Sequence, residues 1–262
     1  MISRLLYFYI KNQYATGYSK DKKRANSFKK LKSIVTHAYE NIPFYREHWN
    51  RHDFRPEKLT KLEDLEKIPK ITKNDLQDNF ESFLDDHNRR KYRSNELKVE
   101  KTTGTVNDPT LIFWGSEASD YKSMIYFRNL RKWNIDIDDK IGYFWPEKTE
   151  RTFYHKKGFW SKYSISTDIN TFDQIKKIKQ IDPDCLFYFP NQLYFISRYI
   201  NKKGLDLNLD LKLVVLQGEP CHPAFQREIK KAFGNVKIVE TYATRETGYT
   251  SQKTNGLHKV NN

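Results

Sequence analysis

The sequence predicts an α/β fold in which a parallel β-sheet with helical crossovers follows a helical N-terminal region. Three apolar runs have the length and composition of buried strands, namely residues 185–189, 211–216 and 236–242. The segments between them, residues 191–200 and 222–233, carry apolar side chains at helical spacing and are followed by Gly204 and Gly234. Because a strand–helix–strand unit of this length forms a right-handed crossover, these strands are expected to lie parallel in one sheet.

The composition favours a folded, aromatic-rich core over disorder. Of the 262 residues, 37% are apolar and 15% are aromatic, so the chain can bury a sizeable core in one large domain or two smaller ones. The formal net charge of +14 has two interpretations, a surface that attracts polyanions or a lysine-rich composition without a specific partner. The basic residues occur along the whole chain, which favours the second interpretation.

The cysteines and the N-terminus predict a cytoplasmic protein. Cys185 and Cys221 show no metal-type spacing, and a reducing compartment is the simplest location for them. Residues 1–10 are apolar but are interrupted by Arg4, are too short to span a bilayer and lack a small-residue cleavage site. We expect a helix that lies on the rest of the protein, with transient membrane contact as the alternative and no stable membrane insertion.

The remaining elements divide the chain into a helical region over residues 1–95 and an α/β region over residues 96–262. In the first region, residues 27–39 form an amphipathic helix that ends before Pro43, and Thr72 caps a further helix with Asp75 three residues later. The second region is expected to contain a helix over residues 116–133, a strand over 141–145, a loop over 147–162 and a helix over 172–181.

A threonine-rich loop at residues 101–110 is the first candidate binding site. It places hydroxyl side chains around Gly104, between two strand-like segments at residues 97–100 and 111–114. Such a loop can direct backbone N–H groups and hydroxyls toward the oxygens of a phosphate chain. Taken alone, the same pattern is typical of a turn between two strands, and this second interpretation is then favoured.

Three turns that follow predicted strands form the second candidate site, at residues 189–191, 217–219 and 242–246. Ligands of open parallel sheets bind beyond the carboxyl ends of the strands, so this placement predicts a binding site. His222 stands beside Cys221 without a third catalytic partner, and the pair is interpreted as a helix start rather than as a thiol nucleophile.

Together these motifs resemble the adenylate-forming enzymes, in the branch that includes phenylacetate–coenzyme A ligase and proteins from capsular polysaccharide gene clusters. Residues 102–110 resemble the family's phosphate loop, and residues 37–46 and 62–73 resemble two earlier landmarks. Gly218-Glu219-Pro220 stands where the family has a Gly-Glu turn beside the adenine. Tyr242-Ala243-Thr244-Arg245-Glu246 corresponds to the family's Tyr-Gly-x-Thr-Glu signature. The resemblance therefore covers nearly the whole chain.

The resemblance implies the large N-terminal domain of such an enzyme, with residues 96–262 as its nucleotide-binding part, and a reaction in two halves. A carboxylate attacks the α-phosphate of ATP to give an acyl-adenylate and pyrophosphate, and coenzyme A or another acceptor then takes the acyl group. Glu246 would bind Mg²⁺ and would act in catalysis together with Arg245. The implied nucleotide contacts are Thr102, Thr103, Gly104, Thr105, Gly218, Glu219, Tyr242 and Thr244.

The chain also departs from the family pattern. Val106 replaces a threonine, Asn107 and Ala243 replace glycines, and Arg245 replaces a threonine that would contact the α-phosphate. Asparagine tolerates positive φ, and arginine can bind a phosphate bidentately. The sequence ends at Asn262, before the positions of the family's ribose-binding aspartate and mobile C-terminal domain. We therefore expect an incomplete domain with impaired adenylation, as a fragment, a shortened product or the partner of a complementing polypeptide.

Alternative interpretations stay open for both the function and the site. The charge and the many aromatic residues also fit a basic nucleic-acid-binding protein, although the aromatics occur in apolar segments and no nucleic-acid motif is present. A non-catalytic remnant is the third possibility. The alternative interpretations are a solvated loop carboxylate for Glu246, a core aromatic for Tyr242 and a surface charge for Arg245. The carboxylate substrate is not named by the sequence, and the aromatics permit an aryl acid: Tyr143, Trp145, Tyr188 and Phe189.

Overall fold

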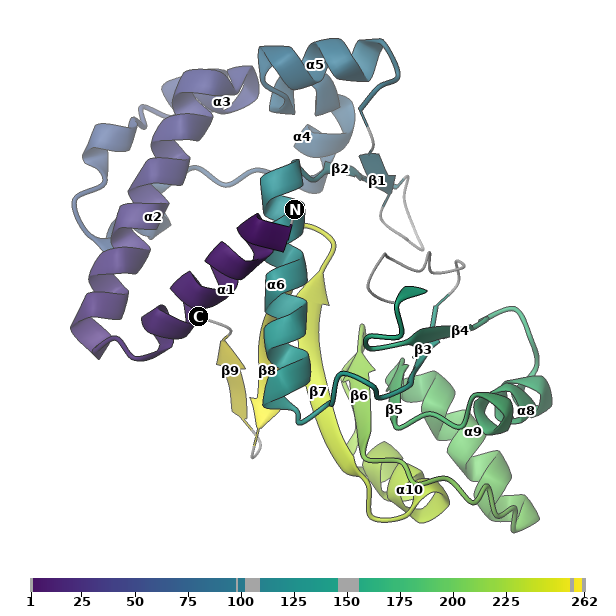
Figure 1. Cartoon of the computed structure of the whole chain (residues 1–262). Coiled ribbons are helices and arrows are strands. Elements are labelled where there is room, and N and C mark those ends of the chain that lie inside the picture. The colour runs from purple at the N-terminus through teal and green to yellow at the C-terminus, as the bar shows by residue number, and fades with distance from the viewer. Residues whose placement is uncertain (1, 98, 102–108, 146–155, 255–256, 261–262) are drawn as a thin grey trace. The chain divides into compact units, whose positions relative to one another are not determined.

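The computed structural model describes residues 2–97, 99–101, 109–145, 156–254 and 257–260. The chain divides into two compact units, Met1–Tyr121 and Lys122–Asn261, and the division falls within helix α6 (Ser116–Lys132) (Figure 1). The two units, called unit 1 and unit 2, are described separately. The domain boundary predicted between residues 95 and 96 stays a prediction.

Unit 1 is mainly helical, as predicted for the N-terminal region. Its elements are α1 (Ile2–Thr16), α2 (Lys20–Asn41), α3 (Pro43–Arg51), three 3-10 helices η1 (Pro56–Lys58), η2 (Leu62–Lys67) and η3 (Phe80–Phe83), α4 (Lys73–Asp78), α5 (Asp86–Arg93), and the antiparallel strands β1 (Val99–Lys101) and β2 (Leu111–Phe113). The predicted cap at Thr72 is confirmed, because its hydroxyl accepts from the Asp75 N–H and the Asp75 carboxylate accepts from Thr72. Helix α2 ends before Pro43, as predicted, and Pro43 also begins α3. Proline is tolerated there because the first N–H groups of a helix have no acceptor within the helix.

The core of unit 1 forms where α2 and α3 pack together. Val35, Trp49, Phe54 and Leu59 are its buried centre. Trp49 contacts Phe54 edge-to-face, with ring centroids 5.4 Å apart. Burial of side chains of this size contributes about 1.5–3 kcal/mol each, which holds the two helices together despite their many lysines and arginines.

Unit 2 contains a seven-stranded sheet in the order β4-β3-β5-β6-β7-β8-β9. Its strands are β3 (Ile141–Phe144), β4 (Lys162–Ile165), β5 (Cys185–Tyr188), β6 (Leu213–Gln217), β7 (Lys237–Thr244), β8 (Gly248–Thr254) and β9 (Leu257–Val260), and its helices besides α6 are α8 (Thr171–Ile181), α9 (Pro190–Lys203) and α10 (Pro223–Phe233). The strands β4, β3, β5, β6 and β7 pair in parallel, and β8 and β9 add antiparallel. The predicted parallel α/β fold is confirmed.

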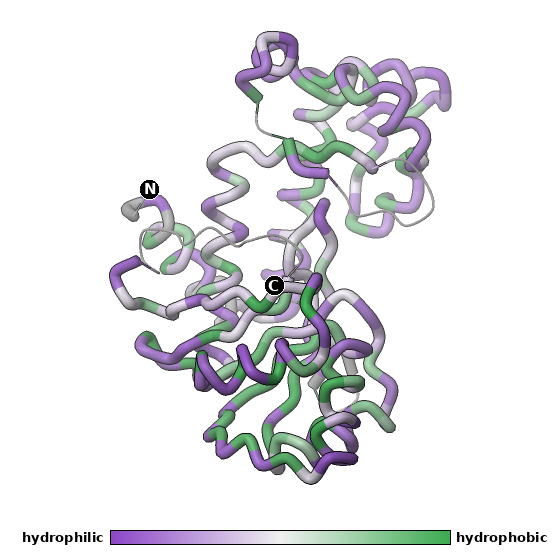
Figure 2. The backbone as a smooth tube through the Cα atoms, turned by 90° about the vertical axis from the view of Figure 1, so that its right-hand side faces the viewer, coloured by the Kyte–Doolittle hydropathy of each residue, from purple (hydrophilic) through white to green (hydrophobic). Residues whose placement is uncertain are grey.

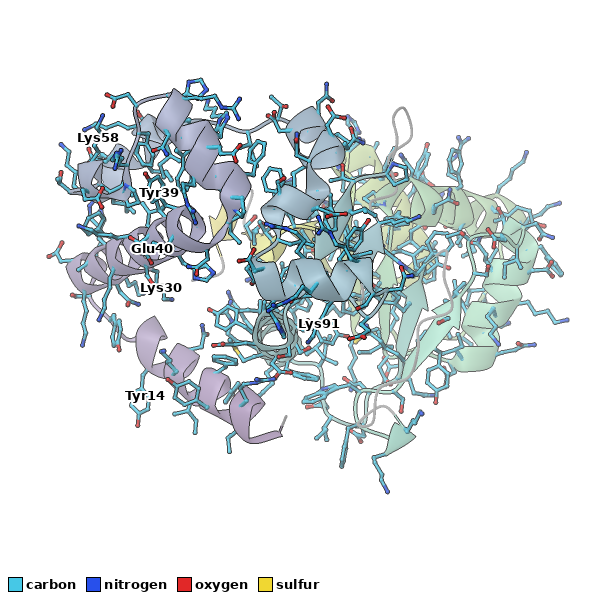
Figure 3. The ribbon with its side chains drawn as sticks, turned by 90° about the horizontal axis from the view of Figure 1, so that it is seen from above. Tyr14, Lys30, Tyr39, Glu40, Lys58 and Lys91 are labelled. Atoms are coloured by element: carbon cyan, nitrogen blue, oxygen red, sulfur yellow. The ribbon has the colours of Figure 1, made fainter. Side chains whose placement is uncertain are left out.

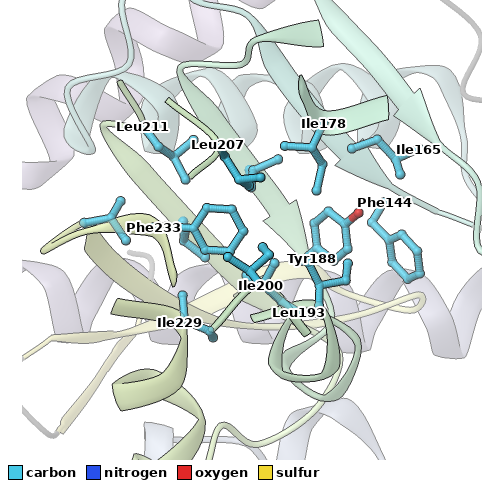
Figure 4. Packing of buried hydrophobic residues seen from close by; sticks show 14 of the residues in the cluster. Phe144, Ile165, Ile178, Tyr188, Leu193, Ile200, Leu207, Leu211, Ile229 and Phe233 are labelled. Carbon is cyan, nitrogen blue, oxygen red and sulfur yellow. The ribbon is translucent and has the colours of Figure 1, made fainter. Parts of the chain in front are cut away.

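Alternate side chains of the central strands enter two different cores. In β5, Leu186 and Tyr188 belong to the cluster under α8, α9 and α10, whereas Phe187 belongs to the cluster that contains Leu130 of α6. Helices therefore cover both faces of the sheet, and its central strands β5 and β6 read as continuous apolar runs (Figures 1 and 2). Figure 4 shows the first cluster, where Tyr188 stacks on Phe144 with ring centroids 4.4 Å apart.

Ionic contacts fix the strand ends opposite the candidate site. The Lys212 ammonium lies 2.6 Å from the buried carboxylate of Asp139 and 3.8 Å from Asp184, and it joins the segments that lead into β3, β5 and β6. These carboxylates raise the pKa of Lys212 above its usual range, so the ammonium stays charged. Among the described residues, no helix has both the length and the apolar character required to cross a membrane.

Candidate functional site

The parallel strands β3, β5, β6 and β7 end at one edge of the unit 2 sheet, which we call the carboxyl edge. The register pairs Gln217, the last residue of β6, with Thr241 of β7. The next residues, Tyr242 to Thr244, therefore extend beyond β6 before the chain turns back, and Thr244 pairs with Gly248 of β8. All three turns predicted to form a binding site lie at this edge.

The turns at residues 189–191 and 217–219 contact each other directly. Gly218 has a φ of +86°, and a Cβ there would lie 2.8 Å from Cε1 of Phe189. The backbone N–H of Asn191 donates to Oε2 of Glu219 over 3.3 Å. Gly218 thus allows the Phe189 ring to pack closely against the backbone. The Glu219 carboxylate accepts a hydrogen bond from the first turn of α9, where a negative charge interacts favourably with the helix N-terminus.

The β7–β8 turn presents charged and aromatic side chains to solvent. The Thr244 hydroxyl accepts from the Thr247 N–H over 3.2 Å and lies 2.9 Å from the Thr247 hydroxyl, so it holds the turn. The Glu246 side chain is exposed. Tyr242 is 57% exposed, so the alternative interpretation of this residue as a core aromatic is wrong. The Arg245 guanidinium carbon lies 5.2 Å from the ring centroid of Trp145, at the end of β3.

A hydrogen-bonded cluster of three side chains, Gln217, Tyr143 and Tyr249, connects these turns at the carboxyl edge. The Gln217 side chain donates to the Tyr143 hydroxyl over 3.2 Å and accepts from the Tyr249 hydroxyl over 3.1 Å. Burial raises the pKa of both tyrosines, and the Gln217 hydrogen bond and the nearby Arg245 charge partly oppose this effect at Tyr143. Both hydroxyls therefore stay neutral and hold Gln217, and with it the turn at Gly218, in a fixed position.

Lys162 of β4 lies beside this hydrogen-bonded cluster. Its ammonium nitrogen is 4.3 Å from the ring centroid of Tyr143 and 4.7 Å from that of Tyr126. Burial lowers its pKa to about 8. Within the part of the chain that the structure describes, no carboxylate lies at ion-pair distance from Lys162, and its ammonium faces the two aromatic rings instead.

The structure brings some of the predicted site residues together and does not describe others. Gly218 and Glu219 occupy one turn and Tyr242, Thr244, Arg245 and Glu246 the next, and Gln217 links the two through Tyr249. Thr102, Thr103, Gly104 and Thr105, with Val106 and Asn107, lie outside the described residues. Sequence reasoning missed Tyr249 and Lys162. A tyrosine three residues after the end of the signature was a usable signal for Tyr249, and no signal pointed to Lys162.

Glu246 is suited to a cation that brings its own oxygen ligands. The described residues contain no group of three His, Cys, Asp or Glu side chains arranged to hold a metal ion. Mg²⁺ is commonly held by one or two carboxylates together with substrate phosphates, so a single exposed carboxylate beside an arginine fits a magnesium–phosphate ligand.

Both cysteines are buried thiols. Burial raises the pKa of the Cys221 thiol to about 11 and that of Cys185 to about 12, so neither forms a thiolate at neutral pH. His222 caps α10, because its Nδ1 accepts from the Ala224 N–H over 3.2 Å. The interpretation of Cys221 and His222 as a helix start is confirmed.

Two surface grooves are lined by residues other than those of the carboxyl edge. One of about 570 Å³ follows α2, and one of about 430 Å³ lies between α9 and α10. The second is lined by the long charged side chains of Arg198, Lys202, Glu228 and Lys231. Neither groove contains a residue of the three turns, and neither has a glycine turn or strand ends that would fix a ligand, so we place the candidate site at the carboxyl edge.

The chain is similar in sequence to known phenylacetate-coenzyme A ligases. The chain is 26% identical over 236 residues to phenylacetate-coenzyme A ligase of Escherichia coli (strain K12) and 24% identical over 233 residues to that of Pseudomonas putida. Each match covers 87% of this chain and 52% of the relative. The predicted resemblance is confirmed. Protein CapK of Staphylococcus aureus is 22% identical over a gapped alignment of 275 positions, which covers 91% of this chain and 55% of CapK. No protein-family model matches the chain.

The fold is that of part of an acyl-coenzyme A ligase. An open crystal structure of 2-hydroxyisobutyryl-CoA ligase, in complex with 2-HIB-AMP and CoA, superposes with a TM-score of 0.70 and 18% identity. The superposition covers 89% of this chain and 53% of that ligase. The chain thus spans about half the length of the curated relatives and solved ligases that it matches.

Proposed function

We propose that the carboxyl edge of unit 2 binds ATP with Mg²⁺, as part of an enzyme that activates a carboxylic acid as an acyl-adenylate and transfers it to coenzyme A or another acceptor. The similarity to phenylacetate-coenzyme A ligases supports the reaction class. The observation that carries the placement is the Gln217–Tyr249 hydrogen bond, which ties the turn at Gly218 to the turn at Glu246. A fixed pair of turns at strand ends is what positioning of a nucleotide requires.

Each side chain of the β7–β8 turn has a role that fits its exposure. The exposed Tyr242 ring would lie against the adenine, where stacking of an aromatic face is favourable. Arg245 would contact phosphate oxygens, and its position over Trp145 limits the rotamers that the guanidinium can adopt. Glu246 would hold Mg²⁺ between itself and the phosphates, which supplies charge neutralisation for displacement at the α-phosphate.

Other parts of the proposal rest on the sequence motifs. The hydroxyls of Thr102, Thr103 and Thr105 and the backbone at Gly104 would bind the β- and γ-phosphates. Gly218 and Glu219 would border the adenine. A role in capsule or polysaccharide biosynthesis is supported by the similarity to CapK alone. The substrate would be a small carboxylic acid, and Tyr143 and Trp145 at the end of β3 suit an aryl acid.

The first test is thermal unfolding with ATP and Mg²⁺. A ligand at about a hundred times its Kd adds about 2.7 kcal/mol, which corresponds to a rise in Tm of roughly 5–10 °C for a chain of this size. Glu246→Gln should remove the part of the shift that depends on Mg²⁺. Glu66→Gln, which changes an exposed carboxylate of η2, should leave it intact.

The outcomes separate the alternatives. A shift with single-stranded oligonucleotide and none with ATP would favour nucleic-acid binding, and no shift with either would favour a non-catalytic remnant. We also expect the 262 residues alone to exchange labelled pyrophosphate into ATP only weakly, because they span about half the length of the ligases they match. Exchange at ordinary enzyme rates would show that the rest of the ligase is dispensable for adenylation.

A further inference from the structure

Helix α1 exposes four large apolar or aromatic side chains on one side, between Leu6 and Tyr14. At about 100° per residue, Leu6, Ile10, Tyr14 and Tyr7 project within a single arc of about 100°. Their side chains are 55%, 46%, 72% and 56% exposed, respectively. Figure 3 shows Tyr14 on the outer side of the helix. We call these four residues the α1 apolar face.

The α1 apolar face is not the side by which the helix attaches to unit 1. Phe8 is buried and contacts the Tyr121 ring edge-to-face at 5.4 Å, and Asn12 is buried as well. Arg4 forms an ion pair with Asp120 of α6. On the helical projection, Phe8 and Asn12 lie on the opposite side from the α1 apolar face, so docking of α1 leaves that face fully available.

Positive charge is concentrated around this helix. Residues 1–32 contain nine lysines and arginines and one aspartate, whereas the whole chain has a net charge of +14. The charge is thus less evenly spread than the composition suggested. Lys11 projects beside the α1 apolar face, and the exposed Lys20, Lys22 and Arg24 begin α2, directly after α1. Helix α1 has no acidic residue in its first turn.

We propose that the α1 apolar face lies in the interface of an anionic lipid membrane, with the lysines at the start of α2 against the headgroups. Tyrosine and aliphatic side chains suit the headgroup–acyl boundary, and each nearby lysine gains attraction from anionic lipid. The 15 residues of α1 are fewer than the roughly 20 that span a bilayer, so the helix would lie in the membrane plane. A second copy of the chain is a poorer occupant, because a symmetric contact would bring the same lysines together.

The test is co-sedimentation of the whole chain with phosphatidylcholine vesicles that contain or lack phosphatidylglycerol. We expect binding to the anionic vesicles, which weakens as salt increases, and little binding to the neutral ones. The triple variant Lys20→Gln, Lys22→Gln, Lys23→Gln should weaken binding on the order of a hundredfold. The control Lys176→Gln, Lys177→Gln, Lys202→Gln removes three exposed lysines from α8 and α9 and should change it little.

A second test measures how much the α1 apolar face contributes to vesicle binding, with a double variant in α1 and a matched control in α8 and α9. Leu6→Gln with Ile10→Gln should weaken binding at least tenfold, because two buried aliphatic side chains are lost from the interface. Phe172→Gln with Phe195→Gln changes two comparably exposed side chains of α8 and α9 and should have no effect. Tyr14→Trp adds a spectroscopic readout. The chain already has five tryptophans, so the difference in emission between the variant and the wild type is measured, and this difference should shift to shorter wavelength on anionic vesicles alone.

Several results would overturn the proposal. Absence of binding to anionic vesicles would do so, as would equal loss in the α1 variants and in the α8 and α9 controls. A change of oligomeric state in Leu6→Gln with Ile10→Gln, without vesicle binding by the parent chain, would assign the α1 apolar face to a second copy. Capture of an acidic protein without vesicle binding would assign it to a protein partner. ATP binding is measured separately, so failure here leaves the proposed function untouched.

Discussion

The Phe189 ring packs against the backbone of Gly218 so closely that a side chain at this position would overlap it. A Cβ on Gly218 would lie 2.8 Å from Cε1 and 2.9 Å from Cδ1 of the ring, and the residue has a φ of +86°. Both the backbone conformation and the contact therefore require glycine. The contact joins the end of β5 to the end of β6 at the carboxyl edge.

Gly218→Ala is expected to destabilise unit 2 by about 2–4 kcal/mol. Positive φ contributes about 1 kcal/mol, and overpacking against Phe189 contributes the remainder. Gly204→Ala is the matched control, because Gly204 has a φ of +60° with no atom within 4 Å of its Cβ position. Gly204→Ala should lower the free energy of unfolding only by the cost of the positive φ, about 1 kcal/mol.

Urea unfolding of the two variants measures this difference. Adding Phe189→Leu to Gly218→Ala should recover part of the loss, since a smaller side chain can move away from the new methyl group. Equal destabilisation by the two alanine variants would mean that the Phe189 contact contributes nothing, and the glycine would then be required by backbone conformation alone.

The central strands and crossovers were predictable because a strand that is buried on both faces has an uninterrupted run of apolar residues in the sequence. The run around Val214 and Val215 is apolar without interruption, and it became β6. The glycines after α9 and α10 ended both helices where expected. Strand direction followed from the crossovers, so the placement of three turns at one edge required only the sequence.

The edges of the sheet were less predictable. Strand β4 reads Lys-Tyr-Ser-Ile and is half-buried, so its pattern lacks the apolar run of a central strand. The loop predicted over residues 147–162 includes its first residue, and no strand is predicted for the rest. Strand β8 is a polar segment that pairs antiparallel with β7, and no local signal predicts it. Tertiary pairing determines such strands more than intrinsic propensity does.

The hydrogen-bonded cluster at Gln217 could not be found from the sequence for a similar reason. Its partners Tyr143 and Tyr249 are 74 and 32 residues away, and they meet only through the register of β3, β6, β7 and β8. The sequence predicted Tyr143 as a pocket aromatic. The structure adds that its hydroxyl accepts a hydrogen bond from the Gln217 side chain.

Tyr249→Phe should destabilise unit 2 by about 1–2 kcal/mol, because it removes the donor to a buried amide oxygen. The control in the same hairpin is Tyr242→Phe, where the ring is exposed and the hydroxyl can be removed without a loss of stability. The free energy of unfolding in urea measures both. If the position of the Gly218 turn depends on Gln217, the affinity for ATP should also fall in Tyr249→Phe. An unchanged affinity would mean that this hydrogen bond stabilises unit 2 without affecting ATP binding.

Arg245→Leu should weaken ATP binding about tenfold, with a smaller effect in Arg245→Lys. Lysine keeps the charge but loses the fork that binds phosphate oxygens in pairs and stacks on Trp145. Arg227→Leu removes an exposed arginine from α10 and serves as the control. Titration with ATP and Mg²⁺ by calorimetry distinguishes the variants, and the same affinity in all of them would make Arg245 a surface charge.

Lys162→Met tests the buried ammonium through the pH dependence of stability. Burial lowers the pKa of Lys162 to about 8 from 10.5 in the unfolded chain, so folding is penalised while the group is charged. Below pH 8 the side chain is protonated in both states and the full penalty applies. Between pH 8 and 10.5 the unfolded state binds more protons, and the stability of the wild type rises with pH by up to about 3 kcal/mol.

Methionine has similar length and no charge, so the variant should lack this rise. We therefore expect Lys162→Met to be more stable than the wild type at pH 7, with a difference that shrinks as the pH approaches 10. Urea unfolding across this range measures the difference, and Lys176→Met on α8 controls for the loss of an exposed lysine. A difference for Lys162→Met that does not change with pH would mean that the two tyrosine faces stabilise the ammonium enough to offset its removal from water.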